Sequence, residues 1–203
     1  MTDVLLVRHG ETQYNLDGVL QGRLNIPLNE TGIAQARALA DELRGIDVRA
    51  IYSSPLQRSH RTAEIISTPH ELAVTTVPTL KERSYGELEG CSRKKREEML
   101  TAREVTKSEF KPTGGEDCYD VVERTLPTLE ELARSHSGER ILVVAHGSVN
   151  RSLLSQFIAG TPRFGYKLTQ SNTGVNRLEF DGSWCVRSLN DTAHLRKTPE
   201  NHV

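Results

Sequence analysis

Two histidines in this chain each follow an apolar run and precede a glycine, a spacing that could bring two imidazoles into one site. The run at residues 4–7 leads into Arg8-His9-Gly10, and the run at 141–145 leads into His146-Gly147. Each run predicts a short strand buried on both faces. Such strands deliver the residues after them to the carboxyl edge of an open α/β sheet, where ligands bind. A single Arg-His pair at a strand end is usually ordinary surface, but the repeated arrangement favours a shared catalytic site.

The stretches between these motifs alternate between strand and helix patterns. Strands separated by helices imply a largely parallel sheet with helices on both faces. We therefore expect an α/β fold, a three-layer α/β/α sandwich with a mostly parallel central sheet and a C-terminal hairpin, forming one domain over residues 1–203. The further strands are predicted at residues 50–53, 74–77, 175–180 and 184–189, the last two joined by Asp181-Gly182-Ser183.

Local signals mark where the helices begin and end. Asn29 is the expected N-cap of the first long helix, and Pro55 suits the first turn of the next. Pro127 predicts a kink or a restart in a helix over about 117–134. The helix after the second His-Gly pair is predicted at 151–158.

Composition excludes several function classes. The 203 residues include 26 basic and 27 acidic ones, so charge gives no case for binding nucleic acid or a membrane surface. No apolar run approaches the roughly 18 residues that span a bilayer, and the N-terminus lacks a signal-peptide pattern. Cys91, Cys118 and Cys185 are odd in number and widely separated, which favours a reducing cytoplasm. The expected partner is a small molecule, and the sequence leaves room for a homodimer.

The first motif extends into Arg8-His9-Gly10-Glu11-Thr12-Gln13-Tyr14-Asn15, which resembles the signature of the histidine phosphatase (phosphoglycerate mutase-like) superfamily. The resemblance continues in order along almost the whole chain, which makes it far more specific than one motif. It implies that Arg58 is the second phosphate-binding arginine and that Glu82 is the general acid. The matching stretches are residues 20–23, 27–32, 35–36, 52–59, 80–90, 115–116, 144–147, 171–173 and 190–195.

Phosphate transfer explains why these residue types belong together. A phosphate monoester is a dianion, and Arg8 and Arg58 supply permanently charged donor forks for its oxygens. His9 is the candidate nucleophile, since an unprotonated imidazole nitrogen can attack phosphorus and form a phosphohistidine. His146, if protonated, can donate to a non-bridging oxygen in the transition state. The sequence therefore predicts a site that needs no metal and no cofactor.

A departing alkoxide also needs a proton, and Glu82 is the position that the resemblance assigns to this role. A neighbouring phosphate dianion favours the protonated form of a carboxyl group. The same group, once ionised, can deprotonate the water that hydrolyses the phosphohistidine. Glu11 and Glu89 are rivals that sequence alone does not exclude. The residues matched to substrate binding are Arg8, Asn15, Gln21, Gly22, Arg58 and Gly147.

Two residues carry competing interpretations. Asn172 either supports the same pocket or caps a loop, and the sequence does not separate these roles. A metal site could gather His9, His146 and His194 with a carboxylate, but no His-x-x-x-His or Cys pair supports it. We therefore expect His194 to be structural.

The resemblance covers both phosphatases and mutases. Glu82-Arg83-Ser84-Tyr85-Gly86 is mutase-like, whereas mutases carry a longer basic insertion with paired arginines and a His-Gly-Asn in place of His146-Gly147-Ser148. We therefore expect a metal-independent phosphomonoesterase acting on small phosphorylated metabolites of the sugar phosphate or phosphoglycerate type. The alternatives are a cofactor-dependent phosphoglycerate mutase and a non-catalytic phosphometabolite-binding module.

Residues 91–114 are the expected variable segment that caps the substrate pocket. Within it, Lys94-Lys95-Arg96 is balanced by Glu97-Glu98. This charge mixture is more typical of a solvated helical face than of a recognition patch.

Overall fold

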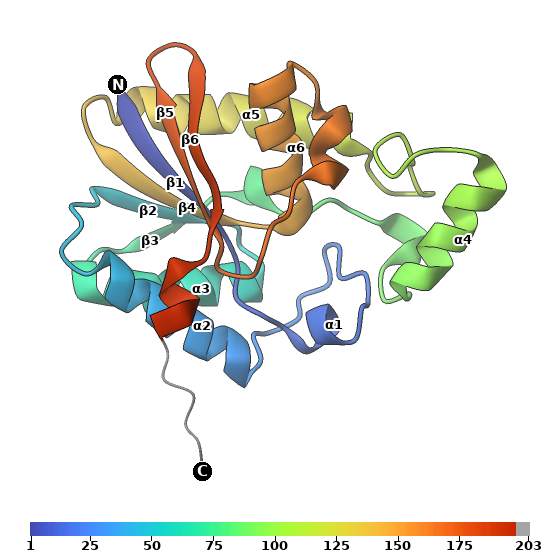
Figure 1. The fold of residues 1–203 in the computed structure, drawn as a ribbon, viewed down its shortest axis with the longest axis horizontal. Helices are drawn as coiled ribbons and strands as arrows, with labels where there is room; N and C mark the ends of the chain where they lie inside the picture. Colours follow the sequence, from blue (N-terminus) through green and yellow to red (C-terminus); the bar gives the residue numbers. More distant parts are fainter. Residues whose placement is uncertain (198–203) are drawn as a thin grey trace.

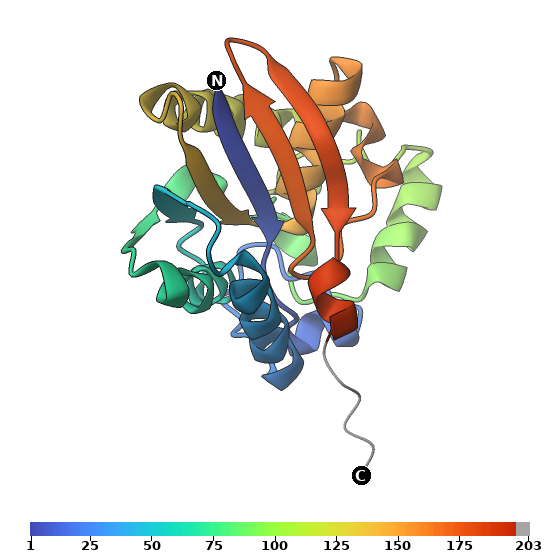
Figure 2. The ribbon, with the colours of Figure 1, turned by 60° about the vertical axis from the view of Figure 1, so that its left-hand side comes forward.

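The computed structural model describes residues 1–197, in which a six-stranded sheet lies between two layers of helices (Figure 1). The strand order is β3-β2-β4-β1-β5-β6. The first four strands of this order run parallel, whereas β5 pairs antiparallel with β1, and β6 antiparallel with β5, as a hairpin (Figure 2). The strands are β1 (Thr2–Arg8), β2 (Ala50–Ser53), β3 (Val74–Thr76), β4 (Arg140–Ala145), β5 (Val175–Phe180) and β6 (Trp184–Asp191). The predicted α/β sandwich with its C-terminal hairpin is confirmed.

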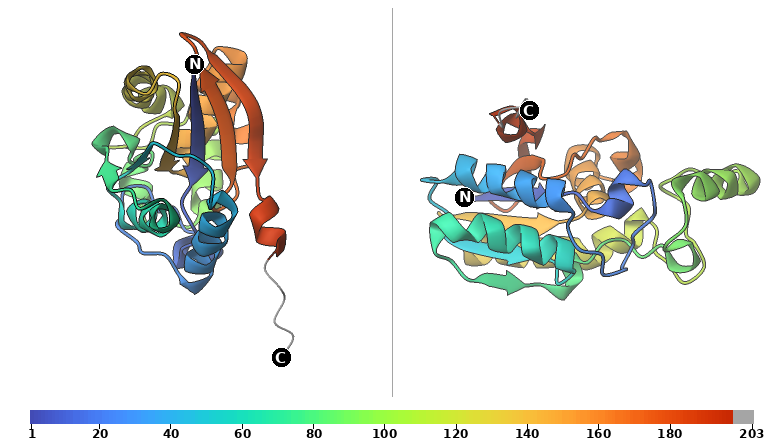
Figure 3. Two further views of the ribbon diagram at one scale, coloured as in Figure 1. Left: turned by 90° about the vertical axis from the view of Figure 1, so that its left-hand side faces the viewer. Right: turned by 90° about the horizontal axis from the view of Figure 1, so that it is seen from below.

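Helices α2 and α3 cover one face of the sheet, and α5 and α6 cover the other, while α4 stands apart from the sheet (Figure 3). The α-helices are α1 (Gln13–Leu16), α2 (Glu30–Leu43), α3 (Gln57–Ser67), α4 (Arg93–Arg103), α5 (Cys118–Ser135) and α6 (Gly147–Ala159). Short 3-10 helices are η1 (Thr68–His70), η2 (Pro78–Leu80), η3 (Gly86–Leu88), η4 (Pro162–Lys167) and η5 (Ala193–Lys197). No helix within residues 1–197 is both long and apolar enough to cross a membrane.

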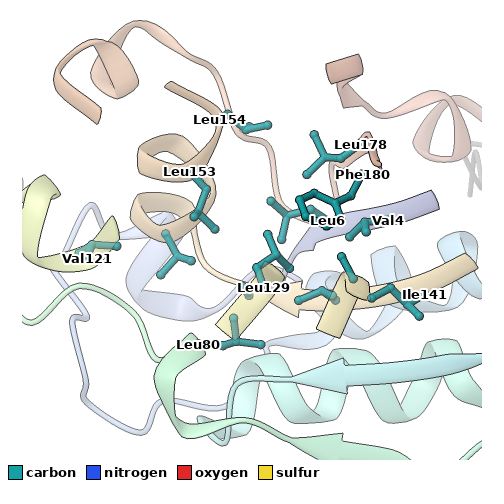
Figure 4. Packing of buried hydrophobic residues seen from close by; sticks show 14 residues of the cluster. Val4, Leu6, Leu80, Val121, Leu129, Ile141, Leu153, Leu154, Leu178 and Phe180 are labelled. Carbon is teal, nitrogen blue, oxygen red and sulfur yellow. The ribbon is translucent and has the colours of Figure 1, made fainter. Parts of the chain in front are cut away.

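The apolar runs form strands because their side chains alternate between two buried faces. Val4 and Leu6 of β1 pack against Leu129 of α5 and Leu153 of α6 (Figure 4). Leu5 points to the opposite face and packs with the buried residues of α2 and α3. Because apolar side chains cover both faces of β1, the polar residues that follow lie beyond its carboxyl end. The site forms there.

Three helix expectations need correction. The last long helix begins at Gly147, before the predicted start at Arg151, because His146 is extended (φ −132°, ψ 167°) and acts as the N-cap. Pro55 lies outside α3, whose N-cap is the extended Leu56. Of the expected kink or restart at Pro127, the restart is wrong, since α5 runs unbroken from Cys118 to Ser135 through the proline. The expected N-cap Asn29 is confirmed, with its side chain accepting from the Gly32 N–H at 2.8 Å.

Candidate active site

Three neighbouring parallel strands end at the same edge and bring the candidate residues together. Arg8 and His9 end β1, His146 follows β4, and Arg58 lies in α3, which follows β2. The His9 N–H donates to the Ala145 carbonyl at 3.0 Å, so the two His-Gly units lie in register. The His9 and His146 ring centroids are 5.2 Å apart. The sequence prediction that the two imidazoles share one sheet edge is therefore met by the geometry.

His9 is fixed in one tautomer by its own backbone surroundings. Its Nδ1 lies 2.7 Å from the Gly10 carbonyl, which can only accept, so Nδ1 carries the proton and donates. Burial, followed by the charges of Arg58 and Arg8, holds the pKa of His9 well below its usual range. His9 is therefore neutral near pH 7, and its Nε2 has a free lone pair.

Arg58 is a buried cation and Arg8 a half-buried one, and the outer nitrogens of both are anchored to backbone. Arg58 donates from Nη1 to the Leu24 carbonyl and from Nη2 to the Gly22 carbonyl, each at 2.7 Å. Arg8 donates from Nη1 to the Gln170 carbonyl at 2.6 Å. The Nε of each arginine is buried without a partner. Burial lowers the pKa of each to about 10, which still leaves both charged at neutral pH.

His146 has no hydrogen-bond partner on either ring nitrogen, although it is fully buried. Burial, followed by the neighbouring Arg58 and His9, holds its pKa well below the usual range. Buried polar groups are normally paired, so these orphaned nitrogens call for an explanation. Together with the unpartnered Nε atoms of Arg8 and Arg58, they form a donor set suited to an anion.

The loop after β1 supplies further polar groups to the same place. Asn15 and Gln21 line the cavity, and Gln21 Oε1 is buried without a partner. Gly22 has φ +51°, and a Cβ there would lie 2.2 Å from Glu89 Oε1, so the turn requires glycine. Asn172 does not line the cavity; it donates to the His9 carbonyl at 3.0 Å and to Asn15 Oδ1 at 3.2 Å. Its place is therefore behind the pocket, where it positions both residues.

Glu82 lies in the segment between β3 and α4, and its side chain lines the same cavity. Its Oε1 accepts from the Arg83 N–H at 2.8 Å, and its Oε2 accepts from the Ser148 N–H at 3.2 Å. The rival Glu11 instead accepts from Asn29 at 2.9 Å, and Glu89 accepts from the backbone N–H of Arg23 at 3.0 Å. Neither rival lines the cavity, whereas Glu82 does.

Arg8, His9, Arg58 and Glu82 line a cavity of about 660 Å³, within the usual size range of small-molecule sites, and His146 lies behind this lining beside His9. Its lining carries far more positive than negative charge, as expected for an anionic ligand. Arg93, Arg96, Glu97 and Lys107 of the charged segment contribute to it. The interpretation of Lys94-Lys95-Arg96 and Glu97-Glu98 as a solvated face therefore needs correction for Arg96 and Glu97, which lie on the side of α4 that faces the cavity.

The side chains that the alternative metal site would need do not form a cluster of ligands in the part of the chain that the structure describes. Within residues 1–197, no three His, Cys, Asp or Glu side chains gather closely enough to hold a metal ion. His194 lies in η5, where its Nε2 is 2.9 Å from Thr173 Oγ1, and it does not line the cavity that His9 lines. Thr173 in turn donates its N–H to the Arg8 carbonyl at 3.0 Å. His194 therefore supports the backbone behind the site, as expected of a structural histidine.

Sequence reasoning missed three cavity residues on the first turns of α6, which are Ser148, Arg151 and Ser152. Ser148 donates its N–H to Glu82 and lies 3.0 Å from the Tyr85 hydroxyl through Oγ. Arg151 also lines the cavity. Placing the helix start at Gly147 would have revealed Arg151, because residues four apart share one helix face.

Comparison with known proteins agrees with this geometry. A model of the histidine phosphatase superfamily (branch 1) matches residues 4–192. A metal-independent phosphoserine phosphatase of Arabidopsis thaliana is 37% identical, covering 96% of this chain and 84% of the relative. Phosphoglycerate mutase-like protein 4 of the same plant is 34% identical, with 97% and 88% covered. A mutant phosphoserine phosphatase of Entamoeba histolytica, solved in complex with phosphoserine, superposes with a TM-score of 0.85 at 28% identity, covering 96% of this chain and all of that one.

The α/β sheet, the cationic cavity at its edge and the phosphatases among the relatives define a phosphoric monoester hydrolase. Within that class, the chain belongs to the histidine phosphatase superfamily.

Proposed function

We propose that this enzyme hydrolyses small phosphorylated metabolites, of the sugar phosphate or phosphoglycerate type, through a phosphohistidine on His9. The observation that carries the proposal is the hydrogen bond from His9 Nδ1 to the Gly10 carbonyl at 2.7 Å. This bond leaves Nε2 unprotonated for attack on phosphorus. Attack forms the N–P bond and breaks the bond between phosphorus and the ester oxygen.

The charges around the reacting phosphorus support the same mechanism. Arg8 and Arg58 offset the dianion, and a neutral His146 can still donate one ring N–H to a non-bridging oxygen. Binding of the dianion favours the protonated His146, which strengthens that donation. Asn15, Gln21, Gly22 and Gly147 bind the phosphate and the substrate body in this proposal.

Glu82 is the proposed proton carrier in both half-reactions. In the first, its carboxylic acid gives a proton to the departing alkoxide oxygen. In the second, the resulting carboxylate takes a proton from water, whose oxygen attacks phosphorus and breaks the N–P bond. The products are the alcohol and inorganic phosphate, and His9 returns to its starting state.

The segment 91–114 is the proposed cap over the substrate body, because Arg93, Arg96 and Lys107 reach the cavity from it. The relatives' names favour phosphoserine or a phosphoglycerate among the candidate substrates. A cytoplasmic location and a homodimer stay predictions. Mutase chemistry is the second candidate, because a mutase-like relative is nearly as similar as the phosphatase relative.

The test is trapping of the intermediate during turnover of a labelled phosphomonoester in the presence of EDTA. We expect an acid-labile, alkali-stable phosphoenzyme on His9, release of free phosphate, and loss of both in His9→Ala. A chelator-sensitive reaction, or label on a carboxylate, contradicts the mechanism. Conversion of 3-phosphoglycerate to 2-phosphoglycerate without free phosphate would establish the mutase instead.

A further inference from the structure

The residues that carry the proposed general acid belong to neither a helix nor a strand. Glu82, Arg83 and Ser84 lie between η2 and η3, so their backbone groups lack the partners that a regular element would provide. Buried backbone groups must then be paired in another way. A general acid must also stand within hydrogen-bond reach of the departing oxygen, so other parts of the molecule have to fix this segment.

One residue, Glu116, supplies several of these partners. Its N–H donates to the Ser84 carbonyl at 2.9 Å, and its carbonyl accepts from Arg83 Nε at 2.6 Å. Its carboxylate accepts the Ser84 N–H through Oε2 at 3.0 Å. Both backbone groups of Ser84 are therefore bound by a residue 32 positions away in the sequence.

Two arginines connect the Glu116 carboxylate to the backbone of Glu82. Arg124 of α5 donates from Nε to Glu116 Oε1 at 2.9 Å and from Nη2 to Glu116 Oε2 at 3.0 Å. The same Nη2 donates to the Glu82 carbonyl at 3.2 Å. Arg23 donates from Nη2 to Glu116 Oε1 at 2.7 Å and from Nε to the Glu82 carbonyl at 3.4 Å. One carboxylate thus orients two guanidinium groups that meet at a single peptide carbonyl, that of Glu82.

The charge and the packing of this cluster agree with a fixed arrangement. Burial raises the pKa of Glu116, but the hydrogen bonds from Arg124 and from the Ser84 N–H outweigh burial and lower that pKa overall. The carboxylate is therefore ionised near neutral pH, as the paired donors of Arg124 require. A Cβ on Gly115 would lie 2.8 Å from the Ser84 carbonyl oxygen, so glycine at this position lets the two segments touch.

We propose that Glu116 is a positioning residue for the general acid: through Arg124 and Arg23 it holds the backbone of Glu82, so that the Glu82 carboxyl group faces the reacting phosphate. Glu116 does not line the cavity, so it acts on the reaction through this segment. The inference rests on the proposed function, in which Glu82 gives the proton to the departing oxygen. A displacement of about 1 Å in a reacting group can cost about 100-fold in rate.

The experiment measures phosphoenzyme formation in single turnovers of an alkyl phosphate, glycerol 3-phosphate, and an aryl phosphate, p-nitrophenyl phosphate. Glu116→Gln keeps the shape of the side chain but removes the charge that orients Arg124 and Arg23. Because only the alkyl leaving group needs the proton, its rate should fall by about 10- to 100-fold, and the aryl rate much less. The loss should lie in the rate of this step and not in the affinity for substrate.

A double-variant cycle separates positioning of the acid from general damage to the fold. In a chain that already carries Glu82→Gln, the addition of Glu116→Gln should not slow the alkyl phosphate further, because the acid that Glu116 positions is gone. A structural defect would add its own loss in both backgrounds. If Glu116→Gln does not fold, Arg23→Gln gives the answer, since it removes one link through a side chain that is 41% exposed. It should show the same dependence on the leaving group, at a smaller size.

The matched control is Asp3→Asn, which removes another carboxylate paired with two arginines. The Asp3 side chain is 14% exposed, against 17% for Glu116, and it lies near the start of β1, away from the cavity lining. It accepts from Arg140 at 2.7 Å and from Arg177 at 2.9 Å. Asp3→Asn should leave both rates of phosphoenzyme formation unchanged.

Equal losses on the two substrates in Glu116→Gln, no loss on either, or additive losses in the double variant would overturn the proposal, and so would the first two results in Arg23→Gln. Failure of the proposed function looks different. The unmodified enzyme would then form no phosphoenzyme, or Glu82→Gln alone would show no dependence on the leaving group. In either case the inference about Glu116 falls with the function.

Discussion

Two parts of the cavity wall are built in opposite ways. The sheet-edge centre (Arg8, His9, Arg58 and His146) consists of buried or half-buried side chains at the carboxyl ends of adjacent strands and at the start of α3. The cap segment (residues 91–114) is mostly exposed, and its Leu100 and Phe110 share a small apolar cluster with Leu20, Tyr85 and Leu88. Groups that must keep a fixed geometry during bond breaking belong on rigid elements, whereas groups that select the substrate body can lie on a less stable segment. The difference assigns chemistry to the sheet edge and selection to the cap.

The link between the two parts is the segment that carries Glu82. Arg83 donates to the Lys107 carbonyl at 3.3 Å and to the Phe110 carbonyl, which ties this segment to the cap. On the other side, Arg124 of α5 donates to the Glu82 carbonyl at 3.2 Å. Glu82 therefore belongs structurally to both parts, and its substitution tests the division most severely.

The largest effect is expected for Glu82→Gln. It should lower phosphoenzyme formation from an alkyl phosphate by about 10²–10⁴-fold, the usual range for a general acid. Formation from an aryl phosphate should fall much less, because a phenolate departs without a proton. Burst or single-turnover kinetics measure this step without the later hydrolysis. Glu97→Gln is the matched control, since Glu97 is also a cavity carboxylate but pairs with Arg96 and Lys107.

For the control we expect a loss below about tenfold and no dependence on the leaving group. If Glu82→Gln slows both bursts equally, or leaves the alkyl phosphate burst unaffected, Glu82 is not the acid. Glu11 and Glu89 would then return to consideration in spite of their places outside the cavity.

The sheet-edge centre should also make the fold sensitive to acid. The pKa values of His9 and His146 are lowered by burial, whereas the same side chains titrate near about 6.5 when unfolded. Below that pH the unfolded state binds more protons, so the free energy of unfolding falls as the pH falls. Each histidine can contribute a slope of at most about 1.4 kcal/mol per pH unit. Urea unfolding between about pH 7 and about pH 5 should therefore show a shallower decline in His9→Ala and in His146→Asn than in the unmodified protein.

Asn150→Ala provides the matched control for this measurement. Asn150 is buried in α6 and donates to Gln170 Oε1 at 3.4 Å, but it does not titrate. Asn150→Ala should lower the free energy of unfolding at every pH. The slope of that free energy against pH should stay the same as in the unmodified protein. A slope unchanged in both histidine variants would mean that these imidazoles do not remain neutral in the folded state.

A feature of this protein could be predicted from the sequence when its signal lies in consecutive residues. The two His-Gly units were found because an apolar run and its end can be read from consecutive residues, and the parallel pairing of β1 with β4 follows from the fold class. The N-cap Asn29 is equally local. These features account for the fold and for most of the sheet-edge centre.

The missed features depend on contacts between distant segments. The Ser148 N–H meets Glu82 only after the chain has folded, across 66 positions in sequence. The role of Asn172, which the sequence left open, likewise depends on a contact with His9 between residues 163 positions apart. The charged face of α4 was misjudged because a balanced charge mixture indicates solvent exposure but does not show which segments lie opposite the helix.

The smallest effect is expected in the cap, for Arg93→Gln. Arg93 is exposed and its guanidinium has no carboxylate partner within residues 1–197, so water and salt screen much of its attraction for an anionic substrate. We expect kcat/KM to fall by less than about tenfold, mainly through KM, and the difference to shrink as ionic strength rises. Lys94→Gln is the matched control, because this neighbouring cation is exposed on α4 but does not line the cavity. A loss of a hundredfold or more in kcat, insensitive to salt, would place Arg93 in the chemistry and remove the division between sheet edge and cap.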